Sequence, residues 1–313
     1  MTRAFVFPGQ GSQAVGMGRD LAEAFGAARL VFEEVDEALG QNLSRLMAEG
    51  PEDELTLTEN AQPALMAVSM AVLRVLEAEG GLDLTRACRF VAGHSLGEYS
   101  ALAAAGTLEL ADAARLLKLR GRSMQQAVPV GEGAMAALLG LDLEAAQAVA
   151  GEAGQGEVCA TANDNAPGQV VVSGHKAAVD RAIAIAAGRG ARRSVLLPVS
   201  APFHCPLMAP AAEAMAEALE KVTLRVPAVP VVANVTAAAV TDPAEIRRLL
   251  VEQVTGLVRW RESVLFMKAQ GVEQLVELGA GKVLAGLTKR IDKDVAATSV
   301  GAPADVEAFL KAL

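Results

Sequence analysis

The stretch RFVAGHSLGEYSALAAAG, residues 89–106, decides the fold. It changes within a few residues from a short apolar run to helical spacing, and His94 and Ser95 lie at the change. A strand that reverses directly into a helix needs small residues on both sides of the corner, and Gly93 and Gly97 supply them. Such a G-x-S-x-G turn raises the serine hydroxyl above the sheet edge, beside the N-terminus of the new helix. The sequence therefore predicts Ser95 as a nucleophile, with a plain glycine-rich turn as the alternative.

Composition limits the class of protein. The chain has 313 residues, enough for one large domain or two smaller ones with ample core. Hydrophobic residues make up 52% and aromatic residues only 3%, so we expect an interior of closely packed small aliphatic side chains. A net charge of -9 argues against a nucleic-acid-binding protein, which needs a basic surface.

The cysteines and the N-terminus indicate the compartment. Cys88, Cys159 and Cys205 are odd in number and lack the paired spacing of a zinc site, so we expect reduced thiols and no metal. The first apolar run ends at Pro8, too short for a secretory signal, and we find no uninterrupted apolar stretch of membrane length. We therefore expect a cytoplasmic protein with no membrane partner, and a monomer.

The order of predicted elements indicates two α/β units. RAFVF at residues 3–7 is a first strand, followed by a loop and mainly helical patterns. Residues 130–198 follow the order strand-helix-strand-strand-helix-strand, which is typical of a ferredoxin-like unit. Strands are then predicted at 229–235 and 274–279, and a last helix near 281–291.

These patterns predict one discontinuous domain with an insertion. We expect a large α/β-hydrolase-like domain from residues 1–129 and 199–313, and a ferredoxin-like subdomain from residues 130–198. The cleft between the two units is the expected ligand site.

A serine nucleophile needs a base within hydrogen-bond reach, and the chain has only three histidines. His94 adjoins Ser95, but its side chain is expected to point away from the corner. His175 opens a predicted helix in the insertion, where capping or solvent exposure is expected. His204, in VSAPFHCPLM, lies where the chain re-enters the large domain beside the cleft. We predict His204 as the base, with a packed core histidine as the alternative.

Acyl transfer also needs N–H donors for an oxyanion. One is expected to be the backbone N–H of Leu96, directly after the nucleophile. The loop FPGQGSQ after the first strand is the best source of a second, with Gln10 as donor. Part of this loop, GQGSQA, also fits a permissive dinucleotide fingerprint, but residues 30–40 read as a helix rather than a second strand that ends in an acid. GAGKVLAG lacks the leading glycine and the Ser/Thr of a P-loop and is interpreted as a helix start.

Five motifs, in this order and across the whole chain, carry a family resemblance: FPGQGSQ, GHSLGEYSAL, LRGRSMQ, PFHCPLM and GAGKVLAGLTKR. Together they resemble the malonyl-CoA:acyl-carrier-protein transacylases of type II fatty-acid biosynthesis. Acyltransferase domains of polyketide synthases share this fold, so the pathway stays open between fatty acids and polyketides. The resemblance implies that Ser95 is the nucleophile and His204 its base, with the backbone N–H groups of Gln10 and Leu96 as oxyanion donors. It also implies that the backbone carbonyl of Gln253 orients the histidine in place of an acid.

Two further residues follow from the resemblance. Arg120 matches the arginine that binds the free carboxylate of the substrate. Phe203 resembles the malonyl-type pattern, whereas selectors of branched extenders commonly carry a serine there. Asp164 is the only acid in a predicted loop near the cleft, and we do not favour it as a catalytic residue.

The implied reaction is a ping-pong transfer from malonyl-CoA through a malonyl-serine to the phosphopantetheine thiol of acyl carrier protein, with no cofactor. A serine hydrolase and a nonenzymatic carrier-binding module are the alternatives. Because carrier proteins are typically acidic, docking on this acidic chain is expected to need a local basic patch, with solvated surface charge as the alternative reading. The candidates are Arg189, Arg192 and Arg193, with Lys282, Lys289 and Arg290 opposite.

Overall fold

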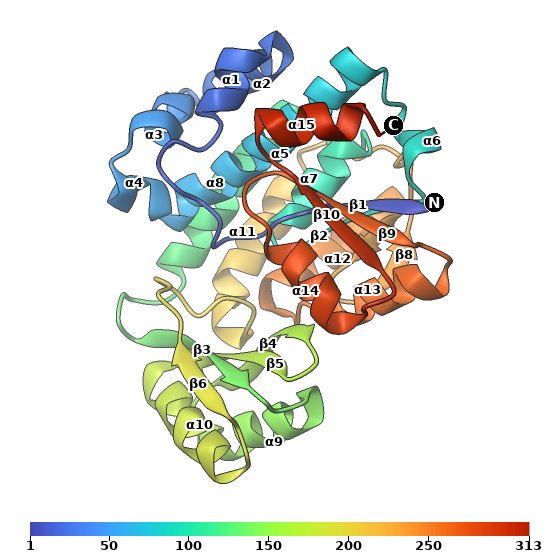
Figure 1. Ribbon diagram of the computed structural model, residues 1–313. Coiled ribbons are helices and arrows are strands. Elements are labelled where there is room, and N and C mark those ends of the chain that lie inside the picture. Colours follow the sequence, from blue (N-terminus) through green and yellow to red (C-terminus); the bar gives the residue numbers. More distant parts are fainter. Residues whose placement is uncertain (313) are drawn as a thin grey trace.

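The computed structural model describes residues 1–312 as a mixed α/β chain with two separate sheets (Figure 1). The larger sheet has six strands in the order β10-β9-β1-β2-β7-β8, and the smaller has four in the order β4-β5-β3-β6. The smaller sheet is built from one continuous part of the chain, drawn in green to yellow in Figure 1.

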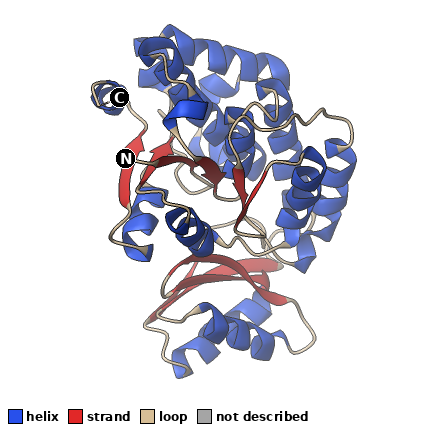
Figure 2. Cartoon of the chain, turned by 90° about the vertical axis from the view of Figure 1, so that its right-hand side faces the viewer, coloured by secondary structure: helices blue, strands red, loops and turns tan. Residues whose placement is uncertain are grey.

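The larger sheet is parallel except at one edge. Its strands are β1 (Arg3–Phe7), β2 (Phe90–Gly93), β7 (Val231–Ala233), β8 (Ala238–Val240), β9 (Gln274–Leu278) and β10 (Ala296–Val300). Only β8 runs antiparallel to its neighbour, β7. The first predicted strand is confirmed, and its residues Phe5 and Phe7 face one apolar cluster while Ala4 and Val6 face another. This alternation explains why helices cover both faces of the sheet (Figure 2).

Helices surround this sheet. Those before the second strand are α1 (Arg19–Ala24), α2 (Gly26–Leu39), α3 (Leu43–Glu49), α4 (Glu52–Thr56), α5 (Thr58–Gly80) and α6 (Leu84–Ala87). Later ones are α7 (Gly97–Ala104), α8 (Leu110–Gln126), a 3-10 turn at Pro206–Met208, α11 (Ala209–Leu219), α12 (Pro243–Thr255), α13 (Trp260–Ala269), α14 (Val283–Ile291) and α15 (Pro303–Leu310).

Helix α5 lies in the middle of the core. By length and composition it is the one helix in residues 1–312 that is able to cross a membrane. However, 83% of its apolar window is buried inside the protein, where it packs against α2, α7 and α8. Its apolar composition is therefore that of a central core helix.

The smaller unit has the element order that the sequence predicts. Its strands are β3 (Gly133–Leu139), β4 (Cys159–Ala166), β5 (Gln169–His175) and β6 (Arg193–Leu196), and all paired strands are antiparallel. Helices α9 (Leu143–Gly154) and α10 (Lys176–Gly188) pack on one face through alanine and valine side chains. Figure 2 shows these helices on the face directed away from the larger sheet.

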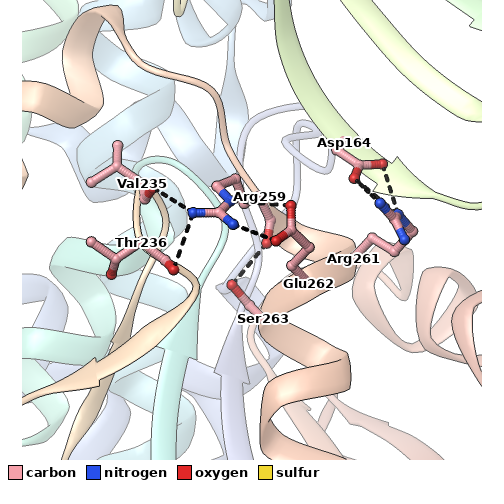
Figure 3. A network of polar contacts seen from close by, with 7 residues as sticks. All are labelled: Asp164, Val235, Thr236, Arg259, Arg261, Glu262 and Ser263. Carbon is pink, nitrogen blue, oxygen red and sulfur yellow. Dashed lines mark hydrogen bonds and ion pairs between the residues drawn. The ribbon is translucent and has the colours of Figure 1, made fainter. Parts of the chain in front are cut away.

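Strand β4 attaches the smaller unit to the chain that enters α13 (Figure 3). The N–H of Asp164 donates to the Val258 carbonyl at 2.9 Å, and the N–H of Val258 donates to the Ala162 carbonyl at 2.9 Å. Asp164 also forms an ion pair with Arg261 at 2.8 Å. Asp164 therefore lies in strand β4 rather than in the predicted loop, and it serves the junction between the units.

The C-terminal prediction is wrong in one respect. The helix expected near 281–291 exists as α14, but it is followed by β10 and α15 and is not the last. Strand β10 is an edge strand with the sequence AATSV, of which only Val300 is buried. A strand with one buried side chain carries little apolar signal in the sequence.

Candidate active site

The turn at Ser95 is a strand-to-helix corner. Strand β2 ends at Gly93, α7 begins at Gly97, and Ser95 has a φ of 54°. A Cβ atom at Gly93 would lie 1.9 Å from the carbonyl carbon of Gly97, and one at Gly97 would lie 2.2 Å from the Phe7 oxygen. Both positions therefore require glycine, which is the role that the sequence predicts for them.

Asn234 fixes this corner from the neighbouring strand. The N–H of Ser95 donates to Asn234 Oδ1 at 2.8 Å, and Asn234 Nδ2 donates to the Gly93 carbonyl at 2.7 Å. Asn234 was not predicted as a site residue. The available signal was an asparagine directly after β7, because polar residues at the carboxyl ends of parallel strands gather at one edge of a sheet.

Ser95 and His204 lie within hydrogen-bond distance. Ser95 Oγ is 2.7 Å from His204 Nε2, and His204 Nδ1 is 2.8 Å from the backbone oxygen of Gln253. A carbonyl oxygen only accepts, so Nδ1 carries the ring proton of the neutral histidine. Nε2 is then the acceptor for the Ser95 hydroxyl proton, which is the geometry of a nucleophile and its base.

The protonation state of His204 suits this arrangement. Burial, together with the positive charge of Arg120, lowers the pKa of His204 to about 3. The imidazole is therefore neutral at neutral pH and its Nε2 lone pair is free to accept a proton.

Arg120 is buried beside this pair. It projects from α8 with only 1% of its surface exposed, so it does not extend to solvent as a surface arginine would. Its Nη1 donates to Gln62 Oε1 at 2.8 Å, and its Nη2 donates to Gln253 Oε1 at 2.8 Å and to Ser95 Oγ at 3.2 Å. Within residues 1–312 its Nε has no partner. All three acceptors are uncharged groups, so they do not neutralise the positive charge of Arg120. That charge is available to an anionic ligand.

A cavity of about 350 Å³ opens over these groups, between the two units. Its lining from the larger unit includes Gln10, Gly11, Gln62, His94, Ser95, Leu96, Arg120, Phe203 and His204, and from the smaller unit Met135, Asn163 and Leu197. Within the described residues 1–312, the backbone N–H groups of Gln10 and Leu96 have no acceptor. The cavity therefore contains every site residue predicted from the sequence except Gln253, which lies behind it and contacts His204 and Arg120.

The other two histidines have different partners. His94 Nε2 is 2.8 Å from Asn165 Oδ1, and its ring lies 5.8 Å from that of Trp260. His175 Nδ1 accepts the N–H of Val158 at 2.9 Å and does not cap α10, so the capping role considered for it is wrong.

The nucleotide-binding alternative does not fit the fold. The loop after β1 leads to α1 and α2 with no strand between them, so residues 30–40 are helical as predicted. Among residues 1–312 there is also no group of three or more His, Cys, Asp or Glu side chains arranged to hold a metal ion.

Comparisons with known proteins agree with this geometry. The acyl transferase domain model matches residues 4–305. The malonyl CoA-acyl carrier protein transacylase of Escherichia coli strain K12 is 49% identical over 308 residues, covering 98% of each chain. The crystal structure of an acyl-carrier-protein S-malonyltransferase from Bartonella henselae is 56% identical, with a TM-score of 0.97 and coverage of 100% of this chain and 99% of that one.

A third relative was solved with a partner. It is a malonyl-transacylase in complex with a type II polyketide synthase acyl-carrier protein, 45% identical, with a TM-score of 0.96 and 100% of both chains covered. At these identities and coverages, the chain belongs to the acyl transferase family.

Proposed function

We propose that this chain performs malonyl transfer through a malonyl-Ser95 intermediate, with His204 as the base. The chain is a malonyltransferase that acts on malonyl-CoA and acyl carrier protein, for fatty-acid or polyketide synthesis. The observation that carries the residue assignment is a buried arginine, Arg120, within 3.2 Å of a serine hydroxyl that is itself 2.7 Å from a histidine nitrogen.

The first half-reaction forms the acyl-enzyme. His204 Nε2 takes the Ser95 proton while Oγ attacks the thioester carbonyl, and the carbonyl oxygen becomes an oxyanion. The N–H groups of Gln10 and Leu96 stabilise this oxyanion. The tetrahedral intermediate then expels the CoA sulfur, which receives the proton from His204.

The second half-reaction reverses these steps with another thiol. The pantetheine thiol of the carrier gives its proton to His204 and attacks the malonyl-serine carbonyl. Collapse of the new tetrahedral intermediate breaks the bond to Ser95 Oγ, which takes the proton back from His204. The net result is exchange of one thioester for another, so no metal or redox cofactor is required.

Arg120 explains the preference for a malonyl group. Its planar guanidinium is able to hold the free carboxylate through parallel charge-assisted hydrogen bonds. A general serine hydrolase has no need of a buried cation at this position, which favours transfer of a carboxylated acyl group. Phe203 lines the same cavity and is assigned to acyl selectivity, in line with the malonyl-type pattern.

The intermediate is directly testable. Mixing the enzyme with malonyl-CoA alone should add one malonyl mass to the peptide that contains Ser95, as measured by mass spectrometry after rapid digestion. A stable adduct supports transfer, whereas turnover to free malonate would indicate a hydrolase. A chain with no adduct and no turnover would be a binding module.

We also propose the finer domain description. Residues 1–129 and 199–313 would form an α/β-hydrolase-like domain and residues 130–198 a ferredoxin-like subdomain. The order β4-β5-β3-β6 with antiparallel pairing supports the second assignment. The three free cysteines support a cytoplasmic location, and we keep the expectation of a monomer.

The basic patch proposed for carrier docking needs refinement. Arg192, Arg193 and Lys289 are exposed, so their charges are available to an acidic partner. Arg189 pairs with Glu152 and contributes less net charge. Arg290 is exposed and keeps its charge, since its partner at 2.7 Å is the neutral Gln169 Oε1. We therefore assign the docking role chiefly to Arg192 and Arg193, together with Lys282, Lys289 and Arg290.

A further inference from the structure

Glu98 is a buried carboxylate next to the nucleophile that the transfer mechanism does not use. It lies in the first turn of α7, three residues after Ser95, with 3% of its surface exposed. Its Oε2 accepts the N–H of Asn234 at 3.0 Å and one N–H of Gln253 Nε2 at 2.9 Å. Both donors are neutral, although a buried carboxylate is normally retained only with strong compensation.

The two donors are the residues that orient the reacting groups. Asn234 binds the backbone of the Ser95 corner through its side chain. Gln253 binds His204 through its backbone oxygen and Arg120 through its side-chain oxygen, each at 2.8 Å. Glu98 is thus bonded to the supports of the nucleophile, the base and the arginine at once.

The carboxylate determines which way the Gln253 amide points. An amide has a donor end and an acceptor end, and a carboxylate accepts only. Because Glu98 and the Ser95 carbonyl both bind Nε2, at 2.9 Å each, the opposite end, Oε1, faces the Arg120 guanidinium. A reversed amide would point its N–H groups at a cation and would push Arg120 away.

We propose that Glu98 is a positioning residue for malonyl transfer, which holds the Gln253 side chain so that Arg120 is aimed at the carboxylate of the acyl group. This inference rests on the proposed role of Arg120. Glu98 does not line the cavity and its hydrogen bonds go to Asn234 and Gln253, so it acts on Arg120 through Gln253.

Both N–H groups, of Asn234 and of Gln253 Nε2, are accepted by Oε2 of Glu98, so these bonds persist whether or not the other oxygen, Oε1, carries a proton. Burial raises the pKa of Glu98 to about 7, while its bonds to Gln253 and Asn234 and the charge of Arg120 act in the opposite direction. Tyr99, which follows it on α7, has its ring 5.8 Å from the guanidinium of Arg120 and packs on the cation rather than neutralising it.

The test compares two thioesters in matched variants. Glu98→Leu removes the acceptor for Gln253, whereas Glu98→Gln keeps an oxygen acceptor of the same shape. Glu277→Leu is the control, because Glu277 is also fully buried and accepts two backbone N–H groups, from Leu284 and Ala285, but lies outside the cavity. The measurement is kcat/KM for malonyl-CoA and for acetyl-CoA, with Tm recorded for each variant.

We expect Glu98→Leu to lower the malonyl-to-acetyl ratio of kcat/KM about tenfold or more, the loss of one hydrogen bond to a charged group. Glu98→Gln should keep the ratio within about threefold, and Glu277→Leu should lower Tm without changing the ratio. The double variant Glu98→Leu/Gln253→Leu should have the same malonyl-to-acetyl ratio as Gln253→Leu alone, because Glu98 is proposed to act only through the Gln253 side chain.

An equal loss for both thioesters in Glu98→Leu would overturn the proposal, since a merely structural residue affects them alike. If that variant does not fold, Glu98→Met carries the same test, because it also removes the oxygen acceptor for Gln253 Nε2 and leaves Gln253 in place. Arg120→Ala separates the two hypotheses. An unchanged ratio there refutes the proposed role of Arg120, whereas a changed ratio there and an unchanged ratio in Glu98→Leu refutes only the role of Glu98.

Discussion

Replacement of Arg120 by alanine tests the basis of substrate choice. In the wild type, acetyl-CoA would leave a cation that is 99% buried with only neutral acceptors, from Gln62, Gln253 and Ser95. Leaving a buried charge without its ionic partner costs about 3 kcal/mol or more, which is over about a hundredfold in discrimination. Arg120→Ala should therefore lower kcat/KM for malonyl-CoA by about a hundredfold and raise the relative activity towards acetyl-CoA.

The assay is transfer of labelled malonyl and acetyl groups to carrier protein at several thioester concentrations. Arg120→Lys should restore only part of the malonyl activity, because a point charge lacks the two-pronged donor geometry. Arg122→Ala is a matched control on the same helix, since its guanidinium is exposed and pairs with Glu59 at 3.1 Å. A malonyl-to-acetyl ratio that stays at the wild-type value in Arg120→Ala would remove this residue from the site.

Other variants test the remaining assignments. Ser95→Ala should abolish acyl-enzyme formation with little change in Tm, as measured by mass spectrometry and thermal unfolding, whereas persistent acylation would identify another nucleophile. His204→Ala should slow both half-reactions, measured by single-turnover kinetics, because one base serves both, and a normal acylation rate would refute its role. Arg192→Glu with Arg193→Glu should weaken transfer to the carrier and its salt dependence but spare acylation by malonyl-CoA, so equal damage to both steps would point to misfolding. The pKa of Glu98 is raised from 4.5 to about 7 in the folded state, so its contribution to stability is complete below pH 4.5 and is lost as the pH rises through 7. Urea unfolding at pH 5 and pH 8 should show that Glu98→Gln gains up to about 3 kcal/mol relative to the wild type over this range, and a constant difference would contradict the shift.

The parts of the fold that the sequence predicts are those with a local cause. The corner at Ser95 follows from two glycines whose replacement would produce contacts of 1.9 and 2.2 Å. The smaller unit follows from six apolar patterns in an order that few folds share. Edge strands β8 and β10 were not predicted, because few of their side chains are buried and their apolar signal is weak.

The site residues divide in the same way. Ser95 and His204 were derived from residue type and position, whereas Gln253 was reached only through the family resemblance. Its partner atom is a backbone oxygen, which every residue has, so no side-chain pattern marks it. Asn234 and Glu98 were missed because the bonds that join them to the site span 136 to 155 positions, a separation at which the sequence contains no periodic signal.

The Gln253 backbone oxygen lies where a serine triad has an acid. A carboxylate in this position would stabilise the imidazolium and raise the pKa of His204, whereas burial and the charge of Arg120 lower that pKa to about 3 beside the neutral carbonyl. A thiol, whose pKa is about 8.5, gives its proton to a weak base more readily than water does, whose pKa is about 15.7, and an expelled thiolate needs little help from an acid. We therefore expect the proposed malonyl-Ser95 to react faster with a carrier thiol than with water, and release of free malonate as fast as transfer would contradict this reasoning.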